Sequence, residues 1–364
     1  MPTYASGLSG QVGAVAESVY GTPVTVTHFY EFLSENFQYV PNWLDGMGLK
    51  AGQAYNRSSR TVVSQSDVNG DLTMEHTSGE ASNAVADSMG FWWKYALGSA
   101  LTTPTVVVGT AFKQVHTNGS KAGQFMTVQV GRPQISGVTV QPFSYTSCKV
   151  TDWEFSVNDN QIAQLKLTFD GQTELTSTGL AAASYPTPNG LFSFANASVM
   201  TIGGTASTSA GETTIAGGTS LGSRVNGVVI TGSTPMKVDR YGLGNAGLKG
   251  EPIENAIPTI TGTLSTEFFS RTELYDVFRT AGTTPLQIDF TKFDAAGNDA
   301  NGAAAGANPY RLSIILPSVK FKTGSVNIGG PDVIPQSIGF QAYDDGTTNP
   351  VIQVKLVSKE SSAI

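Results

Sequence analysis

The chain has 364 residues, of which 40 % are hydrophobic, only 13 % are charged and 41 are glycine. Its net charge of −7 disfavours a protein that grips nucleic acid, because that task needs clustered Lys and Arg. The single cysteine, Cys148, excludes an internal disulfide and a multi-cysteine zinc site. The start lacks a signal-peptide pattern, and no apolar run approaches the roughly 18 residues of a membrane span. We therefore expect a soluble protein made in a cytoplasm, with about two domains.

Alternation of apolar and polar residues predicts a mainly β protein. In 152–157 and 165–169 the apolar side chains fall on one face, and Asn158-Asp159-Asn160 between them is typical of a turn, so these runs predict a hairpin. Further strands are predicted at residues 24–33, 71–75, 105–115, 125–130, 225–231, 259–268, 286–291, 311–321 and 351–357.

Helical patterns occur in two segments. Residues 270–273, Ser-Arg-Thr-Glu, match a capping box, an apolar stripe follows them, and Gly282 stands where a C-terminal glycine belongs. The second predicted helix covers residues 80–97, although Gly90 weakens its middle.

An internal duplication is suggested by the segments that precede these two helices. Residues 70–75 (GDLTME) and 262–267 (GTLSTE) share one skeleton at an offset of 192 residues. Each lies downstream of a similar glycine-rich entry, GLKAG at 48–52 and GLKG at 247–250. The sequence thus predicts two tandem copies.

The expected boundaries follow from composition. We expect an N-terminal arm at 1–28, a first domain at 25–184, a second domain at 185–358 with an exposed Gly/Ser/Thr-rich loop at 203–222, and a C-terminal tail at 359–364. Both ends are candidates for segments that order only on assembly.

Patterns associated with catalysis fail on inspection. Residues 218–222 match G-x-S-x-G, but the last histidine is His116, so the hydrolase order of Ser, acid and His cannot occur. Residues 242–247 match G-x-G-x-x-G, yet Pro252 soon follows and forbids the phosphate-binding helix. Residues 67–71 begin like a calcium loop without its turn glycine or final glutamate. We expect no catalytic residue, cofactor or metal, and a structural or binding role.

Three groups of segments together resemble a known family. They are residues 20–23 (YGTP) leading into 29–35 (FYEFLSE), residues 145–154 (YTSCKVTDWE) and residues 327–337 (NIGGPDVIPQS). Their order and spacing resemble the major tail tube proteins of long, non-contractile-tailed bacteriophages over nearly the whole chain.

The resemblance implies a β-sandwich or open barrel in each copy, with one short flanking helix, and rings that stack into the tail tube of the virion. The tube would deliver the genome to the host, and would be assembled in the host cytoplasm. The implied partners are other copies of the chain, a tape-measure protein, tail terminator and distal tail proteins, and DNA that passes without specific binding. Two copies per chain predict trimeric rings with pseudo-sixfold symmetry; a false duplication would predict hexamers.

Long loops at 41–67 and 236–258 follow the first strand of each copy, and by the resemblance such loops reach the adjacent ring. In the first loop Trp43, Leu44 and Met47 are apolar without an obvious local core. They are candidates for contacts between rings; the alternative is packing against their own sandwich.

Carboxylates recur on the duplicated strand. Alternation places Asp71 and Glu75 on one face, and Glu267 on the equivalent face of the second copy. These are candidates for the lumen wall, and the alternative is that this face meets outer solvent. Both halves are acidic, with 14 acids and 9 bases in 1–184 and 14 acids and 12 bases in 185–364.

An Ig-like β-sandwich that serves as a binding or surface module is the alternative function. The missing signal peptide and disulfides count against it. An enzyme is a third class, which the failed motifs disfavour.

Overall fold

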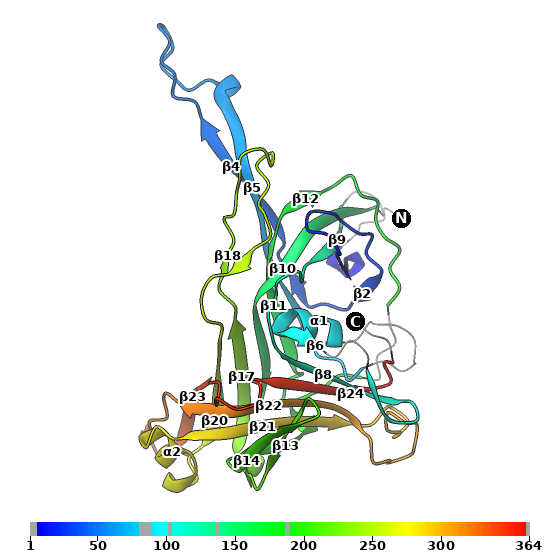
Figure 1. Ribbon diagram of the computed structural model, residues 1–364, viewed down its shortest axis with the longest axis vertical. Helices are drawn as coiled ribbons and strands as arrows, with labels where there is room; N and C mark the ends of the chain where they lie inside the picture. Colours follow the sequence, from blue (N-terminus) through cyan, green and yellow to red (C-terminus); the bar gives the residue numbers. More distant parts are fainter. Residues whose placement is uncertain (1–5, 80–88, 101–103, 136–138, 186–189, 362–364) are drawn as a thin grey trace.

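The computed structural model describes residues 6–79, 89–100, 104–135, 139–185 and 190–361. The protein is mainly β, which confirms the predicted fold class of sandwich-like β sheets with two short helices (Figure 1). Three-residue 3-10 turns at Gly7–Ser9, Ser58–Arg60, Phe194–Asn196 and Gly222–Arg224 connect some of the strands.

The first half of the chain forms two facing sheets that share one long strand. One sheet has the order β2-β1-β9-β10-β12, and the other the order β4-β5-β11-β10, with β3 also pairing with β5. Strand β10 passes from one sheet to the other at a register shift between Tyr145 and Cys148. The bounds are β1 Gln11–Ala16, β2 His28–Tyr30, β3 Ser34–Glu35, β4 Gln38–Asp45, β5 Thr61–Glu75, β9 Met126–Pro133, β10 Val140–Asn158, β11 Gln164–Gly171 and β12 Thr173–Leu175.

The same order of pairings recurs in the second half. One sheet is β13-β21-β22-β24 and the other is β17-β20-β23-β22. Strand β24 also pairs with β8, which is flanked by β6 and β7. The bounds are β6 Gly98–Ala100, β7 Thr105–Val108, β8 Ala111–Asn118, β13 Ala197–Ile202, β17 Val225–Ser233, β20 Thr259–Glu267, β21 Thr283–Lys292, β22 Tyr310–Phe321, β23 Pro335–Ala342 and β24 Gln353–Ser358.

Besides the β8–β24 pair, a second strand pair joins the two halves of the chain. Residues 152–158 of β10 pair antiparallel with residues 227–233 of β17, with Asp152 opposite Ser233. One continuous sheet therefore runs in the order β4-β5-β11-β10-β17-β20-β23. We call it the joint sheet.

Burial alternates from residue to residue along strands of the joint sheet, so one face of the sheet lies against the core and the other faces away from it. Leu72 and Met74 of β5, and Leu264 of β20, point into the core, while the intervening polar residues face away. Helix α1 (Met89–Leu97) packs on this core side, and its Trp92 and Trp93 are fully buried. Burying aromatic side chains of this size is a dominant stabilising term in such a core.

The structure has helical turns in both predicted segments. The described part of helix α1 covers Met89–Leu97, and residues 80–88 of the expected helix lie outside the described residues. The other helix is a π-helical turn, Arg271–Tyr275, followed by α2, Asp276–Arg279. The expected capping box is wrong, because Ser270 makes no side-chain cap and its Oγ instead lies 3.3 Å from Thr272 Oγ1.

The segment expected as an exposed loop at 203–222 is instead largely a hairpin. Strand β14 (Thr205–Ser209) pairs with β15 (Glu212–Ala216), and β16 (Thr219–Ser220) pairs with β13. Thr213 is fully buried, and its N–H donates to Gln353 Oε1 at 2.8 Å. Glycines at the turn positions hid this alternation in the sequence.

The chain termini also differ from expectation. The proposed N-terminal arm holds β1, which pairs with β2 and β9, so this part belongs to the first sandwich. The proposed tail includes Glu360, which is buried and accepts a hydrogen bond from Gln114 Nε2 at 2.6 Å. Residues 1–5 and 362–364 lie outside the described residues.

Two arms leave the joint sheet at the same end. The first arm, residues 41–66, continues β4 and β5 as a hairpin that projects far beyond the body (Figure 1). This segment is therefore not the unstructured loop that we expected. The second arm, residues 234–258, holds the short pair β18 (Met236–Lys237) and β19 (Ile253–Glu254) and runs beside β5.

Candidate functional site

One face of the joint sheet is mainly polar, although Val40 of β4 and Val229 of β17 also lie on it. On this face lie Asp71, Thr73 and Glu75 of β5, together with side chains of the neighbouring strands: Lys166, Thr168, Asp152, Glu154, Thr231, Thr261, Thr263, Ser265, Glu267 and Ser337. The carboxylates Asp71, Glu75 and Glu267 therefore share the side opposite the core. The carboxylates concentrate on the first-half strands, and the second-half strands present mainly Thr and Ser.

Asp71 is held in place rather than freely solvated. Its Oδ1 accepts a hydrogen bond from Thr168 Oγ1 at 2.6 Å, and its Oδ2 lies 3.3 Å from Lys166 Nζ. Burial raises the pKa of Asp71, but the hydrogen bonds from Thr168 and Lys166 outweigh burial, so the pKa lies below its usual value. Asp71 is thus a fixed negative charge on the polar face at neutral pH.

Both ends of the joint sheet are open. At one end, β3 and β4 pair only with β5 among the described residues, and Tyr39 and Val40 are 38 % and 40 % exposed. At the other end, residues 322–328 follow β22 along one side of β23, where the N–H groups of Lys322 and Thr323 donate to the Gly339 carbonyl and Val326 bridges to Gln336. No strand pairs with the other side of this segment among the described residues. Ile328 there is 80 % exposed. Open apolar edges of this kind are sites for strand addition.

The first arm exposes apolar side chains. Trp43, Leu44 and Met47 are 62 %, 50 % and 77 % exposed, and Leu49 at the tip is fully exposed. The alternative that Trp43, Leu44 and Met47 pack against their own sandwich is therefore wrong. Apolar side chains that are exposed on a projecting arm make it a candidate for contacts with another chain.

The second arm, by contrast, is docked on the first half through a buried cation. Lys249 is fully buried, and its Nζ lies 2.6 Å from Asp170 Oδ1 and also contacts Asp67 Oδ1. Gln172 Nε2 donates to the Lys249 carbonyl at 2.9 Å. Burial raises the pKa of Asp170 to about 6, and the charge of Lys249 limits that rise.

Further along the second arm, two carboxylates bind the first half beside two buried lysines. Lys149 Nζ lies 2.5 Å from Glu251 Oε1, and the backbone N–H of Lys121 donates to Glu254 Oε1 at 2.7 Å. The Lys121 ammonium instead donates to the Val150 carbonyl at 3.0 Å, and burial lowers the pKa of Lys121 to about 8. The ion pairs of Lys249 and Lys149, both buried lysines, and the backbone hydrogen bond to Glu254 thus hold the second arm on the first half.

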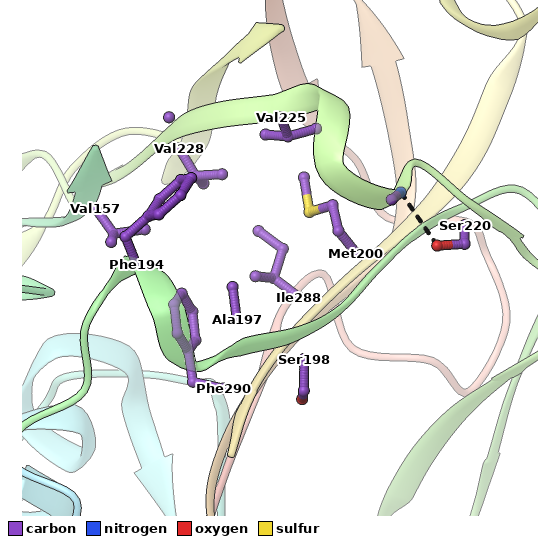
Figure 2. A pocket seen from close by; sticks show the side chains of 12 residues that line it. Val157, Phe194, Ala197, Ser198, Met200, Ser220, Val225, Val228, Ile288 and Phe290 are labelled. Atoms are coloured by element: carbon purple, nitrogen blue, oxygen red, sulfur yellow. Dashed lines mark hydrogen bonds between the residues drawn. The ribbon is translucent and has the colours of Figure 1, made fainter. Parts of the chain in front are cut away.

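A cavity in the second half lies at the G-x-S-x-G motif but lacks the elements of a nucleophile elbow. A cavity of about 350 Å³ in the second half is lined by apolar side chains, including Met200, Ile288 and Phe290 (Figure 2). Ser220 of the G-x-S-x-G motif lies at this cavity, and its Oγ accepts a hydrogen bond from the Gly222 N–H at 3.1 Å. A three-residue turn follows instead of the helix that a nucleophile elbow needs.

Within the described ranges, no three His, Cys, Asp or Glu side chains gather closely enough to hold a metal ion. Nor does any helix in that part of the chain have the length and apolar character of a membrane span.

Sequence reasoning located the polar face and the exposed arm residues but missed the buried lysines and the two open edges. The glycine-rich entry GLKG contained a usable signal, because Lys249 is the one charged residue in that motif. Its acidic partners are 79 and 182 residues away in the sequence, and no local pattern links them.

The fold and these surfaces define a β-rich structural protein with open strand edges and a projecting arm, built to associate with further protein. A family model for phage tail tube proteins matches residues 7–342, and the chain belongs to this family. It is accordingly a structural protein of the phage tail. No curated protein matches the sequence.

Proposed function

We propose that the chain assembles into closed rings of three, and that these rings stack into the tube through which the phage genome reaches the host. The observation that carries this proposal is the β10–β17 pair, which joins the two halves of one chain. If the halves are equivalent, the same joint must be able to form between chains.

The strand registers support two equivalent copies. Lys149 pairs with Asp170 in the first half and Lys320 with Gln341 in the second, and both residues shift by 171. Glu75 pairs with Gln164, and Glu267 pairs with Pro335, with shifts of 192 and 171. The register shift of β10 near Tyr145 also recurs in β22, between Leu316 and Val319. The agreement of these registers and of the irregularity in β10 and β22 supports the proposal that the two halves are equivalent units.

The equivalence specifies how a ring would close. Asp152 and Ser233, opposite each other at the internal joint, correspond to Thr323 and Val40. Residues 323–329 of one copy would therefore pair with residues 34–40 of the next and cover both open edges. Three chains give six equivalent units, which is the pseudo-sixfold ring.

A cysteine pair tests this closure. In Val40→Cys with Thr323→Cys, oxidised tubes should give a ladder that ends at three chains on a non-reducing gel, because a closed ring offers no further partner. The native Cys148 is buried and burial raises its pKa, so it stays unreactive.

The matched control is Asp152→Cys with Ser233→Cys, which places the same pair inside one chain and should give no ladder. A ladder that ends at six chains, or absence of cross-links in well-formed tubes, contradicts the proposed ring.

We also propose that the first arm contacts the adjacent ring through Trp43, Leu44 and Met47. Heterologous stacking of identical rings never closes and so produces a tube. Trp43→Ala with Leu44→Ala should leave circular dichroism and unfolding unchanged, since both side chains are exposed, and should suppress tube formation in electron micrographs. Tubes of normal length from this variant would exclude the contact.

The polar face of the joint sheet is proposed to line the lumen, with Asp71, Glu75 and Glu267 facing the DNA. A ring would carry three times the chain's net charge of −7, and an acidic, Thr/Ser-rich wall avoids trapping a polyanion. On this proposal the tape-measure protein occupies the lumen before DNA does, and the tail terminator and distal tail proteins bind the ends of the tube assembled in the host cytoplasm.

A further inference from the structure

A cavity of about 660 Å³ lies beside the second half of the joint sheet. It is lined by apolar side chains of both halves, including Leu97, Ile257 and Ile260, and by the polar residues Thr259, Gln341, Tyr343 and Asp344. Ile257 at this cavity is 85 % exposed. A partly apolar hollow with an exposed apolar side chain at its rim is a place where another chain can dock.

Three of these lining residues occupy the positions that hold Lys249 on the first half. Lys249 is bound by Asp67, Asp170 and Gln172. With the shift of 192 residues for β5 and 171 for β11, these correspond to Thr259, Gln341 and Tyr343. The cavity on the second half is therefore the counterpart of a site that is filled on the first half.

The natural occupant of this counterpart site is the tip of the first arm. The arms have nearly equal lengths, 41–66 and 234–258, and the tips carry the related sequences GLKAG and GLKG, which align Lys50 with Lys249. Lys50 and Leu49 are exposed in the single chain. The second arm belongs to the second half and docks on the first half, which precedes it in the chain. By the same rule, the first arm would dock on the second half of another chain.

From these correspondences we infer that the tip of the first arm, residues 48–52, seats in the cavity beside Thr259, Gln341 and Tyr343 of a neighbouring copy in the same ring. Lys50 takes the position of Lys249, facing Gln341 and the carboxylate of Asp344. Leu49 covers the apolar lining at Ile257. This inference rests on the proposed ring, since the neighbour must be placed by the strand pairing described above.

Charge and close contacts support this seat. The end of the first arm, residues 46–60, carries Lys50, Arg57 and Arg60 and no acid, whereas Asp344 lies at the cavity. At the filled site, a Cβ built on Gly247 would lie 3.4 Å from the Cα of Gln65. The counterparts of Gly247 and Gln65 are Gly48 and Ile257, so the tip should pass directly against Ile257.

The first arm must bend to reach this seat. Its ladder continues to the pair Asp45–Thr61, whereas the β17–β20 ladder ends at Ser233–Thr259 and the second arm has beyond it only the two-residue pair β18–β19. A register shift between Asn42 and Trp43 marks the weak point at which the first arm can turn. Trp43 and Leu44 lie on the paired stalk of the arm, whereas Met47 adjoins the tip, so only the contacts of Trp43 and Leu44 with the next ring are independent of this seat.

Cross-linking tests the seat directly. In tubes of Leu49→Cys with Ile257→Cys, a short thiol-specific cross-linker should join chains and give a ladder that ends at three. The control, Leu8→Cys with Ile257→Cys, uses a leucine that is 98 % exposed elsewhere on the chain, and should give no ladder.

A ladder that exceeds three chains would place the tip on another ring and overturn the inference. Absence of cross-links, in tubes whose Val40–Thr323 pair does form its trimer ladder, would overturn the seat and leave the ring intact. Failure of the Val40–Thr323 ladder would remove the ring and this inference with it.

A gain of contact provides a second readout. Gln341→Asp recreates the carboxylate that Asp170 offers to Lys249, and should lower the protein concentration needed for tube assembly by about tenfold. The gain should vanish when Lys50→Met is added. A gain that persists without Lys50 would contradict the pairing.

Discussion

Replacing Lys249 by Met should destabilise the chain by about 3–5 kcal/mol, because two acidic partners then lose their cation in a site shielded from solvent. Asp170 is nearly buried, and Asp67 is about one-third exposed, so Asp170 accounts for most of the loss. Urea unfolding of the unassembled protein at pH 7 measures the change. The matched control is Lys50→Met, which alters the equivalent but exposed lysine and should change unfolding by less than about 0.5 kcal/mol.

The destabilisation in Lys249→Met should also depend on pH. The pKa of Asp170 is raised in the fold, so the folded chain binds its proton more tightly than the unfolded chain. Protonated Asp170 therefore stabilises the folded chain at low pH, and this stabilisation is lost as the pH rises through about 6. The loss caused by Lys249→Met should therefore be largest above pH 6 and smaller near pH 4.5. A loss that is equal at both values would exclude Asp170 as the principal partner.

Acid should weaken the fold through two buried histidines. Burial lowers the pKa of His76 to about 4 and that of His116 to about 3, whereas the ordinary value for histidine is 6.5. The unfolded chain then binds more protons than the folded chain below pH 6.5, so stability falls as the pH drops from 6.5 towards 4. A single buried imidazole accounts for about 3 kcal/mol across this range. Asp170 acts in the opposite direction and offsets part of the loss.

His116→Leu isolates one of these groups. Neither ring nitrogen of His116 has a hydrogen-bond partner in the described part of the chain, whereas His76 Nε2 accepts from Trp93 Nε1 at 3.0 Å. The variant should be at least as stable as the native chain at pH 7. At acid pH its unfolding should take up about one proton fewer than unfolding of the native chain. An unchanged pH dependence would show that His116 does not titrate in this way.

Local patterns predicted the parts of the fold that local physics decides. Alternation located β20 at 259–267 and the β10–β11 hairpin, since each strand has one buried face. The polar face of Asp71, Glu75 and Glu267 followed from the same period. The sequence left open whether Trp43 and Leu44 are exposed or pack on their own sandwich, and the structure exposes both.

Features that depend on distant partners could not be predicted. The β10–β17 joint pairs residues 69 to 81 positions apart, and nothing in either strand specifies its edge partner. The first arm forms a ladder because its two strands extend β4 and β5, although its polar composition suggested a loop. Lys249 is buried because Asp67 and Asp170 meet it in space, and a lysine in a glycine-rich segment otherwise indicates an exposed position.

The central claim is that one chain supplies two equivalent units of a ring that three chains close. Electron cryomicroscopy of assembled tubes, at a resolution that distinguishes the two halves, measures this directly. The account predicts three chains per ring, a near-sixfold inner wall built from the joint sheets, and Glu75 and Glu267 alternating on the bore. Six chains per ring, or a wall in which residues 323–329 do not pair with residues 34–40 of the next copy, would contradict it.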